Sequence, residues 1–127
     1  MRKTGSLITN NCILLPHEQK TVYFLLSLGH HIELIPAKSI PGIHTADVCI
    51  DGVAREIKAP IGSGKWTISQ NLRRAHKQSP RIILDLRRCK RAELKAIHEA
   101  EQAFTKTSHL LELWIITKSG KLLAYKK

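Results

Sequence analysis

Residues 46–58 read ADVCIDGVAREIK, and this stretch decides the fold of the chain. Its centre, Asp51-Gly52, is a strong signal for a two-residue turn, because both central residues of a type I′ turn need positive φ angles. The residues on either side alternate in polarity, as half-buried strands do. We therefore predict a β-hairpin with strands over Ala46–Asp51 and Val53–Lys58.

The turn also determines which residues of the two strands face each other. Counting outward from it, Ile50 faces Val53, Cys49 faces Ala54, Val48 faces Arg55, and Asp47 faces Glu56. Strand alternation then assigns one face to the core, occupied by Val48, Ile50, Val53 and Ile57. The opposite face holds Asp47, Glu56 and Lys58. The sequence thus predicts two carboxylates side by side.

Two carboxylates opposed at about 5 Å destabilise a hairpin unless a cation lies between them. Their hard oxygen atoms suit Mg²⁺ or Mn²⁺, and Zn²⁺ stays open as an alternative. Lys58 lies on the same face, where its ammonium group can approach both an attacking water and a scissile phosphate. The competing interpretation is a plain solvated face, on which Lys58 neutralises the two acids.

Outward from the hairpin, the chain alternates between helical and strand patterns. A helix is predicted over His17–Leu28, between Pro16 and a glycine cap, with Glu18 in its first turn. Further helices are predicted over Trp66–Ser79 and Ala92–Phe104, and further strands over His31–Pro36, Arg81–Leu86, Leu110–Thr117 and Lys121–Tyr125. This order, αβββαβ followed by αββ, predicts an α/β fold with a central mixed sheet flanked by helices.

Length and charge limit the possible function. A chain of 127 residues predicts one domain, spanning 1–127, which excludes a multidomain enzyme. Its net charge of +11 favours a polyanionic partner, nucleic acid first. No apolar run approaches the roughly 18 residues that a membrane span needs. Three cysteines without a C-x-x-C pair suggest neither a disulfide framework nor a zinc cluster.

The predicted helix over Trp66–Ser79 has an apolar side and a basic side. We expect the basic side to contact phosphates through Gln70, Arg73, Arg74, Lys77 and Gln78, extended by Lys65 in the preceding loop. A solvated charged face is the alternative. Arg87, Arg88, Lys90 and Arg91 are expected to form a second basic patch.

Aromatic residues make up only 5% of the chain, which argues against a stacking platform for single strands and favours a structured or duplex substrate. Trp66 and Trp114 are each expected to pack against the sheet, although Trp66 could serve one base.

Asp47 followed by Glu56-Ile57-Lys58 across a hairpin resembles the PD-(D/E)xK nuclease superfamily, with Ala46 where a proline is usual. The stretch His17–Arg88, with "GHHIELIP", "TADVCIDGVAREIKAP" and "NLRRAHKQSPRIILDLRR", resembles the C-terminal tRNA-nuclease domains of CdiA contact-dependent growth-inhibition toxins. The resemblance implies a PD-(D/E)xK-like core. It also implies a metal site at Asp47, Glu56 and the backbone carbonyl of Ile57, with Lys58 activating water. Superfamily members often add an acid from the first helix, a place that Glu18 matches and for which Glu33 is the rival.

The same resemblance implies a metal-dependent endoribonuclease that cleaves tRNA. The domain would be released from the C-terminal end of a larger secreted toxin, act in the cytoplasm of a target cell, and be bound by an acidic immunity protein. Three alternatives stay open. They are the same chemistry on DNA, metal-free RNA cleavage by His44, Glu56 and Lys58, and a non-catalytic nucleic-acid-binding module.

Overall fold

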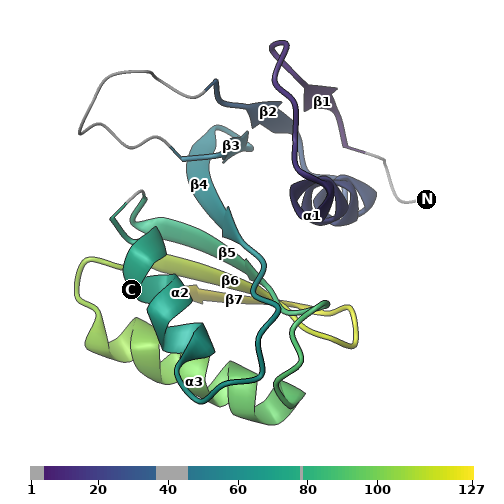
Figure 1. The fold of residues 1–127 in the computed structure, drawn as a ribbon. Coiled ribbons are helices and arrows are strands. Elements are labelled where there is room, and N and C mark those ends of the chain that lie inside the picture. Colours follow the sequence, from purple (N-terminus) through teal and green to yellow (C-terminus); the bar gives the residue numbers. More distant parts are fainter. Residues whose placement is uncertain (1–4, 37–45, 78) are drawn as a thin grey trace.

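The computed structural model describes residues 5–36, 46–77 and 79–127. These ranges form a seven-stranded mixed sheet, in which the strands lie side by side in chain order, together with three helices (Figure 1). The elements are β1 (Leu7–Ile8), α1 (Pro16–Ser27), β2 (Ile32–Leu34), β3 (Val48–Ile50), β4 (Val53–Lys58), α2 (Thr67–Ala75), β5 (Arg81–Asp85), α3 (Glu93–Lys106), β6 (Glu112–Ile116) and β7 (Leu122–Lys126). The predicted α/β class with a mixed sheet is confirmed. The predicted order lacks only the two-residue strand β1.

The β3–β4 hairpin forms in the predicted register. Asp51 and Gly52 have φ angles of 50° and 88°, which is the left-handed geometry that a type I′ turn requires. Val48 pairs with Arg55, and Ile50 pairs with Val53. The Asp51 carboxylate also accepts a hydrogen bond of 2.9 Å from the amide of the residue that precedes β2. The turn is therefore tied to the neighbouring strand.

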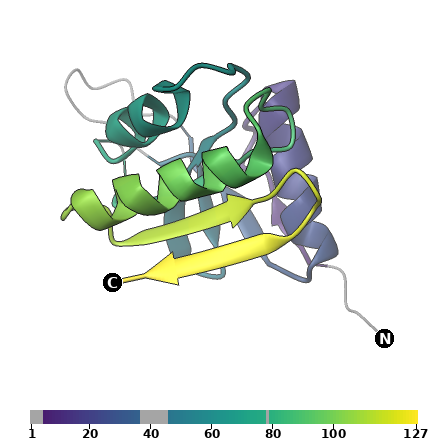
Figure 2. The same cartoon turned by 90° about the horizontal axis from the view of Figure 1, so that it is seen from below.

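The sheet separates two hydrophobic layers. On one face, Val22 and Leu25 of α1 pack against β2, β3 and the centres of β4 and β5. On the other face, α2 and α3 cover β5 and β6, and Ile68, Leu72 and Ala100 lie in that layer. Figure 2 shows α3 running along β6 and β7 with α2 beside it, while α1 stands apart from both. Successive strand residues consequently point toward different helices.

Several element ends differ from the sequence-based expectation by one to four residues, and one short strand was not expected. Helix α2 ends at Ala75 rather than at Ser79, and the Lys77 amide donates to Arg74 O at 3.3 Å, three residues back instead of the four of an α-helix. Strand β1 was missed because two residues are too few to show a periodicity. In the described residues, no helix is long and apolar enough to cross a membrane.

Candidate active site

Asp47 and Glu56 meet at the open end of the β3–β4 hairpin. Glu56 is only 2% exposed, and its carboxyl interacts directly with the Asp47 side chain. Strand β3 begins one residue after Asp47, so the next β4 amide, that of Ile57, donates its hydrogen bond to Asp47 Oδ2 at 3.0 Å. The Asp47 carboxylate thus takes the place of a ladder partner and is held facing Glu56.

This arrangement raises the pKa of Glu56 to about 8. Burial is the largest cause, followed by a hydrogen bond to the Asp47 carboxyl and by the negative charge of Asp47. The ammonium group of Lys58 opposes the shift. With both acids ionised, neither could donate the hydrogen bond to the other. Glu56 Oε1 is moreover buried without a partner among the other described side chains and backbone groups. Repulsion between the two carboxylates therefore favours a proton or another cation between them.

Lys58 completes a charged group of three side chains. Its Nζ lies 3.7 Å from Glu56 Oε2, and its side chain is 28% exposed. The ammonium group can consequently reach both the acid pair and a molecule that enters from solvent. Lys58 lies two residues after Glu56, and strand alternation brings both side chains to one face, as predicted.

Glu56 and Lys58 lie on the α2 face of the sheet. Glu56 is in register with Ile82, and Lys58 with Leu84, and these two partners pack in the layer beneath α2 and α3. Ile57, between them, points to the α1 layer. The group lies where β4 ends and the chain leaves for α2.

The structure places the two rival acids differently. Glu18 lines a pocket of about 380 Å³ that Asp47 also lines, but Glu18 Oε1 accepts a hydrogen bond of 2.9 Å from the amide of Leu15. Glu18 therefore acts as a cap of α1. Glu33 is exposed and pairs with Cys49, which lies two residues after Asp47 and nearer the hairpin turn. Within residues 5–36, 46–77 and 79–127, no three Asp, Glu, His or Cys side chains gather as a metal-binding cluster.

Asp47 and Glu56 nonetheless fit a divalent cation. Glu56 Oε1 is a buried oxygen that lacks a hydrogen-bond partner, and the facing carboxyl of Asp47 supplies further oxygens. Hard oxygen donors of this kind are the ligands of Mg²⁺ and Mn²⁺, which commonly bind through one or two carboxylates and keep several waters. Two side-chain ligands are therefore sufficient for such an ion.

The basic side chains on and beside α2 are exposed, as predicted, but only some of them lie on the open surface, and the others line a groove. Gln70, Arg74 and Lys77 are exposed. Arg73 and Lys65 instead line a groove between α2 and α3, away from the acid pair. The other predicted substrate contact, Gln78, and His44 of the metal-free alternative lie outside the described residues.

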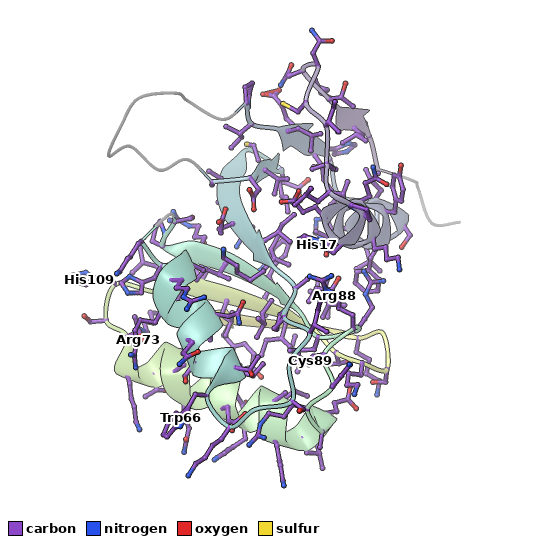
Figure 3. All side chains as sticks on the ribbon, viewed as in Figure 1. His17, Trp66, Arg73, Arg88, Cys89 and His109 are labelled. Atoms are coloured by element: carbon purple, nitrogen blue, oxygen red, sulfur yellow. The ribbon has the colours of Figure 1, made fainter. Side chains whose placement is uncertain are left out.

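The expected second patch is largely used within the protein. Arg87 binds the buried carboxylate of Asp85 with an Nη2–Oδ2 distance of 2.7 Å, and Arg91 binds Glu99 with an Nε–Oε1 distance of 2.6 Å. Arg88 Nε donates to the backbone oxygen of Ala59 at 2.7 Å. Figure 3 shows Arg88 and His17 near each other between α1 and the end of β4. Nearby acceptors thus engage three of the four cations of the expected second basic patch, and Arg88 and Lys90 are exposed.

The two tryptophans also differ from each other. Trp114 is packed against the core, and the guanidinium of Arg55 lies 3.9 Å from its ring centre. Trp66 is 63% exposed, so the expectation that it packs against the sheet was wrong. Arg55 itself is 5% exposed on the α1 face and pairs with Glu112 at 3.5 Å. Alternation would have placed Arg55 there, because it lies two residues from Val53 and Ile57.

Comparison with known proteins adds a family and a fold. The family model described as the contact-dependent growth inhibition CdiA C-terminal domain matches residues 44–122. A solved structure, the "CdiA-CT/CdiI toxin and immunity complex from Burkholderia pseudomallei", is similar with a TM-score of 0.72 and 17% sequence identity. The similarity covers 97% of this chain and 100% of that chain. At this identity the likeness shows the fold alone. A comparison with curated proteins finds no match.

Proposed function

The chain belongs to the family of CdiA C-terminal domains of contact-dependent growth inhibition, and from this premise we propose that it is a toxic, metal-dependent endoribonuclease that cleaves tRNA. Its core would be of the PD-(D/E)xK type. The observation that supports this function is the close pair of the buried Glu56 and the half-buried Asp47 beside Lys58, on a chain whose net charge is +11. Such a pair costs folding energy, which a role in binding a cation explains.

Asp47, Glu56 and the backbone carbonyl of Ile57 would hold the metal ion. When bound, the ion would neutralise charge on the attacked phosphate and favour ionisation of a water molecule. Lys58 Nζ, 3.7 Å from Glu56 Oε2, would orient the attacking water and stabilise negative charge that develops on the phosphate oxygens. Water would attack phosphorus while the bond to the leaving oxygen breaks. Glu18, which lines the same pocket as Asp47, would be the further acid of the site.

The basic surface supports a nucleic-acid substrate. Gln70 and Arg74 of α2 are exposed, as is Lys77 just after the end of this helix, which follows the acid pair in the chain. Side chains of this kind contact phosphates and set the register of a bound nucleic acid without reading its sequence. Gln78, which is outside the described residues, belongs to this proposed surface as well. The choice of tRNA over other nucleic acids rests on the resemblance to CdiA nuclease domains.

Family membership also suggests partners and a place of action. The similar Burkholderia structure is a complex of a toxin with its immunity protein. We expect an immunity protein for this chain too, with an acidic surface that complements its positive charge. The domain would belong to a larger secreted toxin and act in the cytoplasm of the target cell.

The test is cleavage of total tRNA and of plasmid DNA by the purified protein in Mg²⁺ or Mn²⁺. We expect tRNA fragments from the wild type, none after addition of EDTA, and none from Asp47→Ala. Circular dichroism must show that the variant is folded. Undiminished cleavage in EDTA would contradict the metal role, cleavage of DNA alone would contradict the substrate, and binding without turnover would favour a non-catalytic module.

A further inference from the structure

Helices α2 and α3 enclose a groove that the proposed cleavage reaction does not use. Its volume is about 440 Å³, and its walls include Lys65, Trp66 and Arg73 from the α2 side and Gln102 and Lys106 from α3. Figure 3 shows Trp66 and Arg73 on the side of α2 that is next to α3. Asp47, Glu56 and Lys58 do not line it, so the groove is a separate feature of the surface.

Trp66 is the unusual residue of this groove. Its indole is 63% exposed, although tryptophan has the largest side chain to bury on folding. The residue stands at the first position before α2, where it caps no backbone group with its side chain. The packing of α2 against the sheet uses Ile68, Leu72 and Ala75 instead. The fold therefore does not need an indole at position 66.

Positive charge surrounds the indole. The Lys65 ammonium group lies 5.3 Å from the centre of the Trp66 ring, and Arg73 and Lys106 line the same groove. The groove also contains one carboxylate, that of Glu99, but Arg91 binds both of its oxygens at 2.6 and 2.7 Å. The net character of the groove is thus an aromatic surface among cations. A nucleotide presents the complementary pair, a base with a π face and a phosphate with negative charge.

We propose that the α2–α3 groove binds an unpaired nucleotide of the RNA substrate, whose base stacks on Trp66 and whose phosphate contacts Arg73 or Lys106. This inference rests on the proposed function, because it presumes a nucleic-acid substrate. Binding of an unpaired nucleotide in the groove requires an RNA substrate that carries a loop, bulge or single-stranded end beside a structured part. The exposed cations of α2 hold the phosphates of the structured part while the unpaired nucleotide enters the groove.

The test measures binding in an Asp47→Ala background, so that no RNA is cut. The probes are a short RNA hairpin with an unpaired loop and a blunt RNA duplex with the sequence of its stem. Trp66→Ala should lower affinity for the hairpin about ten-fold, the usual size of a lost stacking contact, and leave affinity for the duplex unchanged. Leu94→Ala is the matched control, because Leu94 is an apolar side chain of α3 that is 82% exposed outside the groove.

Tryptophan fluorescence gives a second readout that does not depend on stability. The chain has two tryptophans, and Trp114 is packed beneath Arg55. Titration with the hairpin should quench the fluorescence, whereas Trp66→Phe should remove the quenching and leave the emission of Trp114.

The outcomes separate the two proposals. Equal affinity of Trp66→Ala and its parent for the hairpin, or an equal loss for hairpin and duplex, would overturn the groove but not the nuclease. Failure of the parent to bind either RNA would contradict the proposed function itself. Weakened binding of an acidic protein partner with unchanged RNA affinity would likewise overturn the groove as a nucleotide site.

Discussion

Replacing Glu56 by glutamine should make the protein more stable at alkaline pH. The pKa of Glu56 is about 8 in the folded protein, against an ordinary value of 4.5. The folded state therefore holds one more proton than the unfolded state between these two values. Stability must fall as the pH rises through this window, and it must be fully retained below the unfolded pKa.

The size of the effect follows from the shift. Each pH unit within the window changes the free energy of unfolding by about 1.4 kcal/mol. Between about pH 5 and about pH 8 the free energy of unfolding of the wild type should fall by about 3 kcal/mol. The fall is less than the full width of the range would give, because Glu56 is partly titrated in the unfolded state near pH 5 and in the folded state near pH 8. Glu56→Gln keeps the shape of the side chain and cannot ionise, so it should not show this loss.

Urea unfolding at a series of pH values measures the effect, because urea is uncharged and its slope reports the surface exposed. The quantity to plot is the difference in unfolding free energy between Glu56→Gln and the wild type. Glu33→Gln, an exposed acid on the same face of the sheet, controls for the loss of a negative charge. A difference that stays constant with pH would refute the close pairing of Asp47 and Glu56.

Other predictions concern the framework around the site. Gly5→Ala should destabilise the protein by about 1–3 kcal/mol in urea unfolding, because an added Cβ would lie 1.7 Å from the His30 carbonyl oxygen. Arg55→Met should change the free energy of unfolding by less than about 1.5 kcal/mol, because methionine keeps the carbon chain and removes the buried Nε and Nη1 atoms that lack partners. Arg55→Ala should cost about 3–5 kcal/mol, because it also removes the carbon chain that fills the core. Asp85→Asn should cost about 2–4 kcal/mol at neutral pH. Burial opposes ionisation of Asp85, but hydrogen bonds from Arg87 and Thr21 outweigh burial and lower its pKa, so this cost should shrink as the pH falls through the folded pKa.

The hairpin and its acid pair could be predicted from local chemistry. A turn with two positive φ angles almost demands Asp-Gly or a similar pair, and the period of two residues then decides which side chains face each other. The prediction that Asp47 faces Glu56 needed no knowledge of the rest of the fold. Their roles in binding a metal stay predictions, because side-chain geometry alone does not report a bound ion.

What could not be predicted depends on contacts between distant parts of the chain. Arg91 forms an ion pair with Glu99 on α3. Trp66 is exposed because α2 packs against the sheet through other residues. Neither result follows from a local pattern, since each depends on how two elements meet. Arg55 is a different case. Strand alternation places it on the buried face of β4, but charged residues are usually exposed, so a buried position is not expected from its residue type.

In the proposed site, a divalent cation replaces the proton between Asp47 and Glu56. Calorimetric titration with Mn²⁺ at about pH 7, in two buffers of different ionisation enthalpy, measures both the binding and the protons released. The wild type should bind one ion and release close to one proton, because a carboxyl with a pKa of about 8 is mostly protonated at that pH. Glu56→Gln should bind weakly and release none. Absence of Mn²⁺ binding by the folded wild type, or binding without proton release, would contradict the claim.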